Sequence, residues 1–166
     1  MFKQRVTTRL IEKYLDRFGW PQHEAQDEAG EQEGLVMTGW QSAGGGVGLL
    51  IDPIKERSLL RFVAVEILKA PPSSTPADRL AALLLCMGFL NRLLVLGKWS
   101  YDPSDGEVRF DLGVAIDDDH LSFEAFEHCL KIVVIAVDSH APTLRSIAAG
   151  ELTASEFLAR NGSRMG

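Results

Sequence analysis

The sequence predicts an α+β domain in which helices pack on an antiparallel sheet of five strands. Apolar residues recur with helical spacing in some stretches and with strand spacing in others. The strand candidates are joined by short connections, which antiparallel pairs allow and parallel pairs do not. The chain has 166 residues, of which 46% are apolar and 24% are charged, as in a soluble globular domain. The predicted order is α-β-β-β-α-β-β-α, followed by short C-terminal helices.

The N-terminal part of the chain is predicted to begin with a helix over residues 6–18. Its apolar residues share one face, and Gly19 and Pro21 end it. The stretch from Gln22 to Glu33 contains five acidic residues, no Lys or Arg and no periodic apolar face. We therefore expect a solvated loop in this stretch.

Three strand candidates follow. Residues 35–41 and 47–51 flank a glycine-rich connection and predict a hairpin. Asp52-Pro53 is predicted to turn the chain into a third strand over residues 58–68. Both faces of this third strand are apolar, which indicates a central position in the sheet.

The second half of the chain contains two further helices and a hairpin. Thr75-Pro76 is typical of a helix start, and the helix is expected to continue to Leu96, before Gly97. Residues 98–102 and 107–116 flank Pro103-Ser104-Asp105-Gly106, which predicts a tight hairpin turn.

The C-terminal part is predicted to be helical. Ser122 caps a helix over about 123–138 that ends near Pro142, and short helices follow at 143–149 and 154–160. The expected domain organisation is a single α+β domain over residues 1–150 and a short helical C-terminal tail over residues 151–166.

The central helix at 79–96 has two apolar stripes. One stripe comprises Leu80, Leu83, Leu84, Met87, Leu90 and Leu94, and the other comprises Ala82, Leu85, Cys86, Phe89, Leu93 and Leu96. A helix in the outer layer of a sheet needs one stripe, and soluble monomers rarely expose a second one of this size. The second stripe is therefore covered by the helix at 123–138 or by the same helix of another subunit. The candidate dimer contact is formed by Leu85, Phe89, Leu93 and Leu96, although the roles of the two stripes can be exchanged.

Several short motifs occur along the chain in a distinctive order. They are Tyr14-Leu15-Asp16, Gly19-Trp20, the strand from Gly34 to Trp40, Phe89-Leu90-Asn91, Leu96-Gly97-Lys98-Trp99, Asp102, Asp105-Gly106-Glu107-Val108-Arg109, Val137-Asp138 and Pro142. In this order they resemble the YbjN-like family of bacterial proteins over residues 6–150. That family carries a sensory-transduction regulator label and has the fold of type III secretion chaperones. The resemblance implies a small α+β fold, often dimeric through the central helix, without established catalytic residues.

No catalytic, cofactor-binding or metal-binding residues are predicted. The glycine-rich stretch 44–48 precedes Leu49, where a dinucleotide fingerprint requires Gly or Ala, and no helix follows it. The aspartates after Asp102 do not have the spacing of a calcium loop. Cys86 and Cys129 lie in apolar helices and are expected to be buried small hydrophobes.

Composition limits the possible partners and the compartment. A net charge of -6 argues against a general nucleic-acid binder, and the apolar run from Leu80 to Leu90 is too short to span a membrane. Two cysteines and no visible signal peptide favour the cytoplasm. The expected function is a non-enzymatic, chaperone-like or regulatory homodimer that binds an unidentified protein or peptide. The alternative is a small-ligand or metal-responsive sensor with a pocket between sheet and helices.

Overall fold

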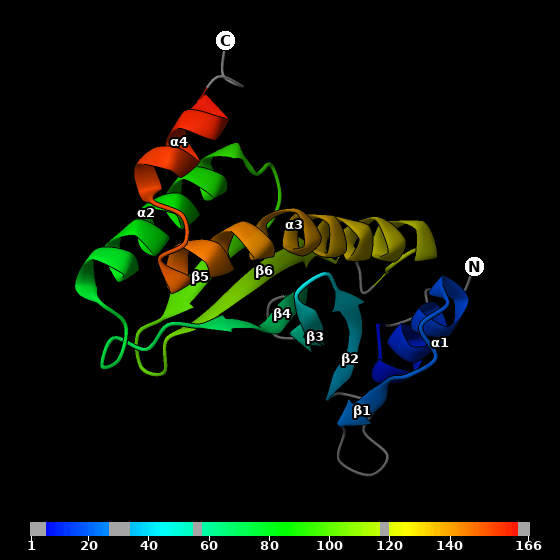
Figure 1. Ribbon diagram of the computed structural model, residues 1–166. Coiled ribbons are helices and arrows are strands. Elements are labelled where there is room, and N and C mark those ends of the chain that lie inside the picture. The colour runs from blue at the N-terminus through cyan, green and yellow to red at the C-terminus, as the bar shows by residue number, and fades with distance from the viewer. Residues whose placement is uncertain (1–5, 27–33, 55–57, 117–119, 163–166) are drawn as a thin grey trace.

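The computed structural model describes residues 6–26, 34–54, 58–116 and 120–162, and it has the expected α+β architecture (Figure 1). In chain order the elements are α1 (Thr8–Phe18), β1 (Glu24–Gln26), β2 (Leu35–Ser42), β3 (Gly45–Ile54), β4 (Leu59–Lys69), α2 (Ala77–Leu93), β5 (Lys98–Asp102), β6 (Glu107–Ala115), α3 (Phe123–Ala149) and α4 (Ala154–Gly162). α3 crosses one face of the sheet, α2 and α4 pack beside it, and α1 lies at the end formed by β1 and β2 (Figure 1).

The sheet has six strands, so the prediction of five strands is wrong. Its order is β1-β2-β3-β4-β6-β5, and all neighbouring strands are antiparallel. The additional strand, β1, lies in the stretch 22–33 for which the sequence predicts a loop. Its three residues are too few to show a strand period, and it forms by pairing with β2, with Ala25 opposite Val36. Residues 27–33 lie outside the described part of the chain.

The strands β2, β3 and β4 agree with the predicted hairpin and with a central third strand. β4 pairs with β3 on one side and with β6 on the other. Asp52 and Pro53 do not turn the chain but continue β3, where they pair with Arg61 and Leu60. The alternation of buried side chains in β3 continues through Pro53, and this burial keeps the segment in the strand.

α2 begins one residue after the predicted first helical position, Pro76, and ends earlier than the sequence predicts. Pro76 occupies its N-cap position without a side-chain hydrogen bond, so the expected Thr75 cap is absent. Leu94 adopts an extended conformation (φ −76°, ψ 131°), and the helix ends at Leu93 rather than at Leu96. The three residues after Leu93 therefore belong to the connection that leads into β5.

α3 is one helix of 27 residues and contains Pro142, so the predicted break near this proline is wrong. Pro142 is exposed, whereas Ala141, Leu144 and Ile147 are buried. Proline has no N–H and so removes one backbone hydrogen bond of the helix. The burial of Ala141, Leu144 and Ile147 in the core offsets this loss, and the helix therefore continues through Pro142. The predicted cap is present, because Ser122 Oγ accepts a hydrogen bond from the Ala125 N–H at 3.1 Å.

α4 begins with the predicted capping box. The Thr153 N–H donates to Glu156 Oε2 at 2.8 Å, and the Glu156 N–H donates to Thr153 Oγ1 at 3.2 Å. Phe157 is buried and packs edge-on against Phe89 of α2, with the ring centroids 5.6 Å apart. The C-terminal helix thus covers part of the central helix.

The hydrophobic core fills the space between the sheet and the helices. Phe62 of β4 and Phe126 of α3 are both fully buried, and their ring centroids lie 5.6 Å apart. The sensor interpretation places a ligand pocket in this layer. The hollow described below lies instead along the edge of β2.

Candidate functional site

The first candidate surface is the outer side of α2 and of the connection that follows it. Leu85, Leu93 and Leu96, three of the four predicted contact residues, are 54%, 48% and 43% exposed. Phe89, the fourth, is partly buried against Phe157 and lies at the edge of this surface. The structure therefore leaves three of the predicted residues exposed and assigns Phe89 largely to packing within the chain.

The division of α2 into two stripes is only partly correct. Leu83, Met87 and Leu90 of the first stripe are buried, and so is Cys86 of the second. Leu84, from the first stripe, is exposed. We call the resulting surface the α2 apolar face; it consists of Leu84, Leu85, Gly88, Leu93, Val95 and Leu96.

Gly88 lies beside Leu84 and Leu85 of the α2 apolar face, with the exposed Arg92 one turn later, and has no packing reason inside the described part of the chain. A Cβ built on Gly88 has no heavy atom within 4 Å outside its own helix backbone and chain neighbours. Glycine in an exposed helix interior costs about 1 kcal/mol relative to alanine. The position therefore offers close access to the helix backbone at a cost in helix stability.

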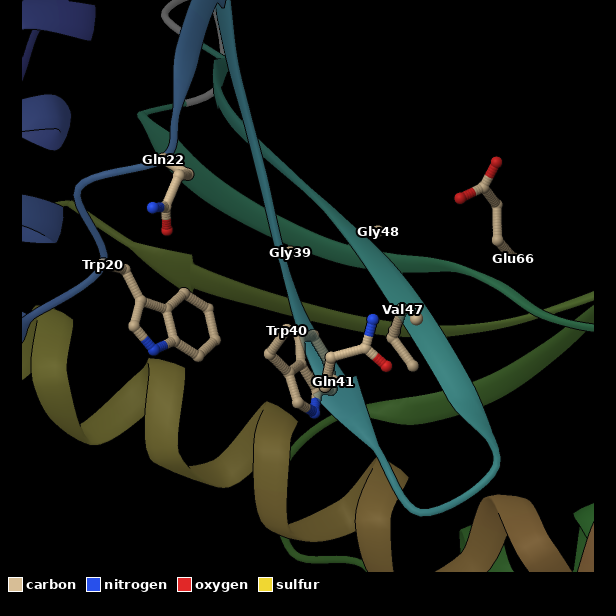
Figure 2. A pocket seen from close by; sticks show the side chains of 9 residues that line it. Trp20, Gln22, Gly39, Trp40, Gln41, Val47, Gly48 and Glu66 are labelled. Atoms are coloured by element: carbon tan, nitrogen blue, oxygen red, sulfur yellow. The ribbon is translucent and has the colours of Figure 1, made fainter.

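The second candidate surface lies along the free edge of β2 (Figure 2). The indoles of Trp20 and Trp40 stack with centroids 5.8 Å apart and ring planes 20° apart. Trp40 Nε1 donates a hydrogen bond to Asp138 Oδ1 of α3 at 3.0 Å. Phe18 packs edge-on against Trp20 at 5.4 Å. The two indoles are thus held in fixed positions between α1 and α3.

A hollow of about 570 Å³ follows this edge. Its lining is formed by Trp20, Gln22, Gly39, Trp40, Gln41, Gly46, Val47, Gly48 and Glu66. None of these nine residues carries a positive charge, and Glu66 is the one acidic residue among them. Gly39 and Gly48 place no side chains on the sheet between the strand edge and Glu66 (Figure 2), and a Val65 methyl group lies beside Gly48. The hollow is therefore polar, aromatic and negatively charged.

Glu66 lies in a distorted part of β4. The pairing of β4 with β6 shifts register between Ala64 and Leu68, and Glu66 has a φ of +61°, which non-glycine residues rarely adopt. Its N–H donates to Glu107 Oε1 at 3.2 Å, and Glu107 in turn pairs with Arg109. A carboxylate oxygen of Glu66 lies 3.4 Å from a Cβ built on Gly48. The bulge thus brings the Glu66 carboxylate beside Gly48 of β3, next to the Val65 side chain.

The opposite edge of the sheet, formed by β5, is blocked. Asn91 of α2 accepts a hydrogen bond from the Trp99 N–H at 2.7 Å and donates one to the Trp99 carbonyl oxygen at 2.9 Å. A side chain therefore occupies the backbone groups that a further strand would need. Gly39 to Ser42 of β2 pair with β3 on one side, and no strand among the described residues lies on the other. Just before this stretch, the Thr38 hydroxyl donates to the Gln22 carbonyl oxygen at 2.9 Å.

The described residues contain no group of three or more side chains suited to hold a metal ion. Asp102 and Asp105 accept hydrogen bonds from backbone N–H groups in the hairpin turn, at 2.9 Å from Ser104 and 3.0 Å from Glu107. The Ser104 hydroxyl, which donates to Asp102 Oδ1 at 2.6 Å, and then the Ser104 N–H lower the pKa of Asp102, and the Glu107 N–H lowers the pKa of Asp105. Asp102 and Asp105 therefore hold the backbone of the hairpin turn by hydrogen bonds. The run Asp117-Asp118-Asp119 lies outside the described residues.

α3 has the length and mean hydropathy of a membrane span. In this fold, however, Phe126, Val133 and Leu144 are among its fully buried residues, because the helix packs on the sheet. A helix in the core of a globular domain can have the same length and hydropathy as a membrane span, so these two properties do not show that α3 crosses a membrane.

Comparison with known proteins places the chain in a family. Residues 7–146 match the YbjN family, described as "Putative bacterial sensory transduction regulator". The chain belongs to the YbjN family. No curated protein matches it in sequence.

Two solved structures are similar to it. YbjN from E. coli, described as "a putative transcription regulator", has a TM-score of 0.61 at 13% identity, with 90% of this chain and 97% of that chain covered. The ExsC-ExsE complex has a TM-score of 0.54 at 18% identity, with 85% and 97% covered. At these identities the similarity concerns the fold, and neither description names an enzymatic activity.

The YbjN-like motifs of the sequence meet in this structure. Trp20, Trp40 and Asp138, from three separate motifs, form the stacked and hydrogen-bonded group at the β2 edge. Asn91 and Trp99, from two others, form the clasp at β5. These residues are not predicted as a site from the sequence alone, although their presence in the family motifs is a signal that could have pointed to them. Glu66 gave no such signal.

Proposed function

We propose that this YbjN-family chain is a non-enzymatic interaction module that acts as a homodimer through the α2 apolar face and binds a protein or peptide. The observation that carries the proposal is the set of exposed Leu and Val side chains of the α2 apolar face, with Gly88 beside Leu84 and Leu85. The buried free cysteines fit a reducing compartment, and we place the protein in the cytoplasm.

A second copy of α2 is the best-fitting occupant of this face. In a twofold dimer the same patch lies on both subunits, so it must be complementary to itself. An antiparallel copy crossing at Gly88 lets the two backbones approach, because no side chain stands between them there. Leu84 and Leu85 on one side of Gly88 then pack around the partner's equivalent of Leu93. Val95, which is 95% exposed, also becomes covered.

The predicted contact is tested first with a charge in the α2 apolar face. Leu85→Glu should convert the dimer into a monomer, because burying an unpaired carboxylate in an apolar contact costs several kcal/mol. The measurement is light scattering coupled to size-exclusion chromatography, with twice the chain mass of 18.3 kDa expected for the unmodified protein. Ile135→Glu is the matched control, since Ile135 is an apolar side chain of α3 that is 64% exposed. A monomer before mutation, or a stable Leu85→Glu dimer, contradicts the proposal.

Gly88 provides a second variant that separates assembly from folding. Gly88→Leu should leave the fold intact, because there is open space around the position and leucine favours helix. It should nevertheless weaken the dimer by at least tenfold, because the added side chain stands where the two backbones meet. Equal dimer stability with glycine and leucine would show that the helices do not cross at this residue.

A further inference from the structure

We infer that the free edge of β2 binds an extended peptide segment as an added strand, with a basic side chain lying over Gly39 and Gly48 to Glu66 and apolar neighbours against Trp20 and Trp40. The inference rests on the proposed function, in that the partner is a protein, and it specifies where that partner binds and what its chemistry is. It does not depend on the dimer.

The two edges of the sheet differ in their access to a new strand. Trp99 of β5 has both its backbone groups engaged by Asn91. The β2 segment from Gly39 to Gln41 lines a hollow of about 570 Å³, and no strand among the described residues pairs with it on that side. Thr38 lies outside this open stretch, because its hydroxyl donates to the Gln22 carbonyl oxygen at 2.9 Å. Edge strands direct alternate N–H and C=O groups outward, and these groups recognise an extended peptide. The β2 edge is therefore the acceptor.

The glycines determine which side chain the peptide can place on the open face of the sheet. Gly39 pairs with Gly48, so two neighbouring strands are without side chains at the same level. A Cβ on Gly39 would lie 2.6 Å from the Val47 carbonyl oxygen, so a larger residue does not fit there. Since strands are about 4.8 Å apart, an added strand lies about 10 Å from Gly48. A long side chain lying flat across the glycines spans this distance to Glu66.

Charge selects the type of that long side chain. Glu66 is exposed, and the lining of the hollow contains no Lys or Arg. The chain as a whole has a net charge of -6. A lysine or arginine of the partner would therefore meet a carboxylate that pairs with no Lys or Arg among the described residues, and an acidic side chain would be repelled.

The backbone of Glu66 supports a role in binding. A φ of +61° is unfavourable for glutamate and would be relieved by glycine. Strained residues of this kind persist where the strained conformation is used, and bulges re-aim side chains beside binding sites. Here the bulge carries the one carboxylate of the hollow toward Gly48.

The opposite side of the added strand contacts the indoles. Side chains alternate between the two faces of a strand, so the residues on either side of the basic residue point toward Trp20 and Trp40. Asp138 and Phe18 hold this indole pair in place, so that its surface is preformed. The recognised pattern is thus apolar, basic, apolar.

The test uses a capped heptapeptide of threonines with a central Val-Arg-Val, titrated into ¹⁵N-labelled full-length protein. We expect shifts of the Gly39–Ser42 amides and of the Trp20 and Trp40 indole N–H groups, with the buried Trp99 indole unchanged. Replacing the central arginine with glutamate should weaken binding at least tenfold, and methylating alternate peptide nitrogens should abolish it. Equal binding of both peptides, shifts centred on β5, or no shifts at millimolar peptide would overturn the inference.

Glu66 variants separate recognition from folding. Glu66→Gly should raise the denaturation midpoint, because the strain is relieved, and should weaken arginine-peptide binding at least fivefold. Binding of a matched peptide with leucine in place of arginine should not change. Glu66→Gln should give the same loss of arginine preference. The monomeric Leu85→Glu variant should bind as well as the unmodified protein, so failure of the dimer and failure of the peptide site are distinguishable.

Discussion

Cys86 shows how burial of a single side chain controls its chemistry. It lies in α2 with no exposed surface, and burial raises the pKa of its thiol from 9.0 to about 11. Cys129 is also buried, and burial raises the pKa of its thiol as well. Both residues therefore behave as small hydrophobes, as the apolar surroundings in the sequence predict.

The raised pKa of Cys86 gives the folding stability a definite pH dependence. The thiol ionises near pH 9 in the unfolded chain but only near pH 11 in the folded one, so unfolding releases a proton between these values. The free energy of unfolding should therefore fall as the pH rises from 9 toward 11. Urea denaturation across this range should show a steeper fall for the unmodified protein than for Cys86→Ala. Parallel curves would contradict a shifted Cys86 thiol.

At the scale of elements, Pro142 is the clearest conflict between local preference and the fold. Proline in a helix interior removes one backbone hydrogen bond and costs about 3 kcal/mol relative to alanine. Because Pro142 is exposed, its replacement loses little packing. Pro142→Ala should therefore raise the free energy of unfolding by about 1–3 kcal/mol, measured by urea denaturation. Ser146→Ala, a substitution one turn later in α3, is the control, and a destabilised Pro142→Ala would show that the proline is needed for packing.

Local signals predicted most elements, and tertiary contacts decided the exceptions. The capping residues Ser122 and Thr153 act over three residues and were found from the sequence. β1 depends on a partner strand, and the persistence of α3 beyond Pro142 depends on buried neighbours. Such contacts have no local pattern, which is why the number of strands and the helix ends were predicted incorrectly.

At the scale of the whole molecule, the two candidate surfaces differed in how far the sequence could predict them. Helical periodicity predicts a contact through Leu85, Phe89, Leu93 and Leu96. Leu85, Leu93 and Leu96 are exposed in the structure, although Leu96 lies beyond the end of α2, and the contact itself stays a prediction. The β2 edge joins Trp40 to Asp138, 98 positions apart, and only the fold brings them together. The two surfaces lie on different elements, so the protein has room to pair with a copy and hold a peptide at once.

The division into a domain over residues 1–150 and a helical tail predicts the result of a truncation. Residues 151–162 add packing on α2, chiefly through Phe157, which is 2% exposed and contacts Phe89. The sheet and α3 do not require the tail, so a chain ending at Gly150 should fold with its secondary structure intact. It should lose about 3–5 kcal/mol of unfolding free energy, as should Phe157→Ala in the full chain, because a buried phenylalanine is removed in both. Circular dichroism and urea denaturation measure this, and an unfolded truncated chain would make α4 an integral part of the domain.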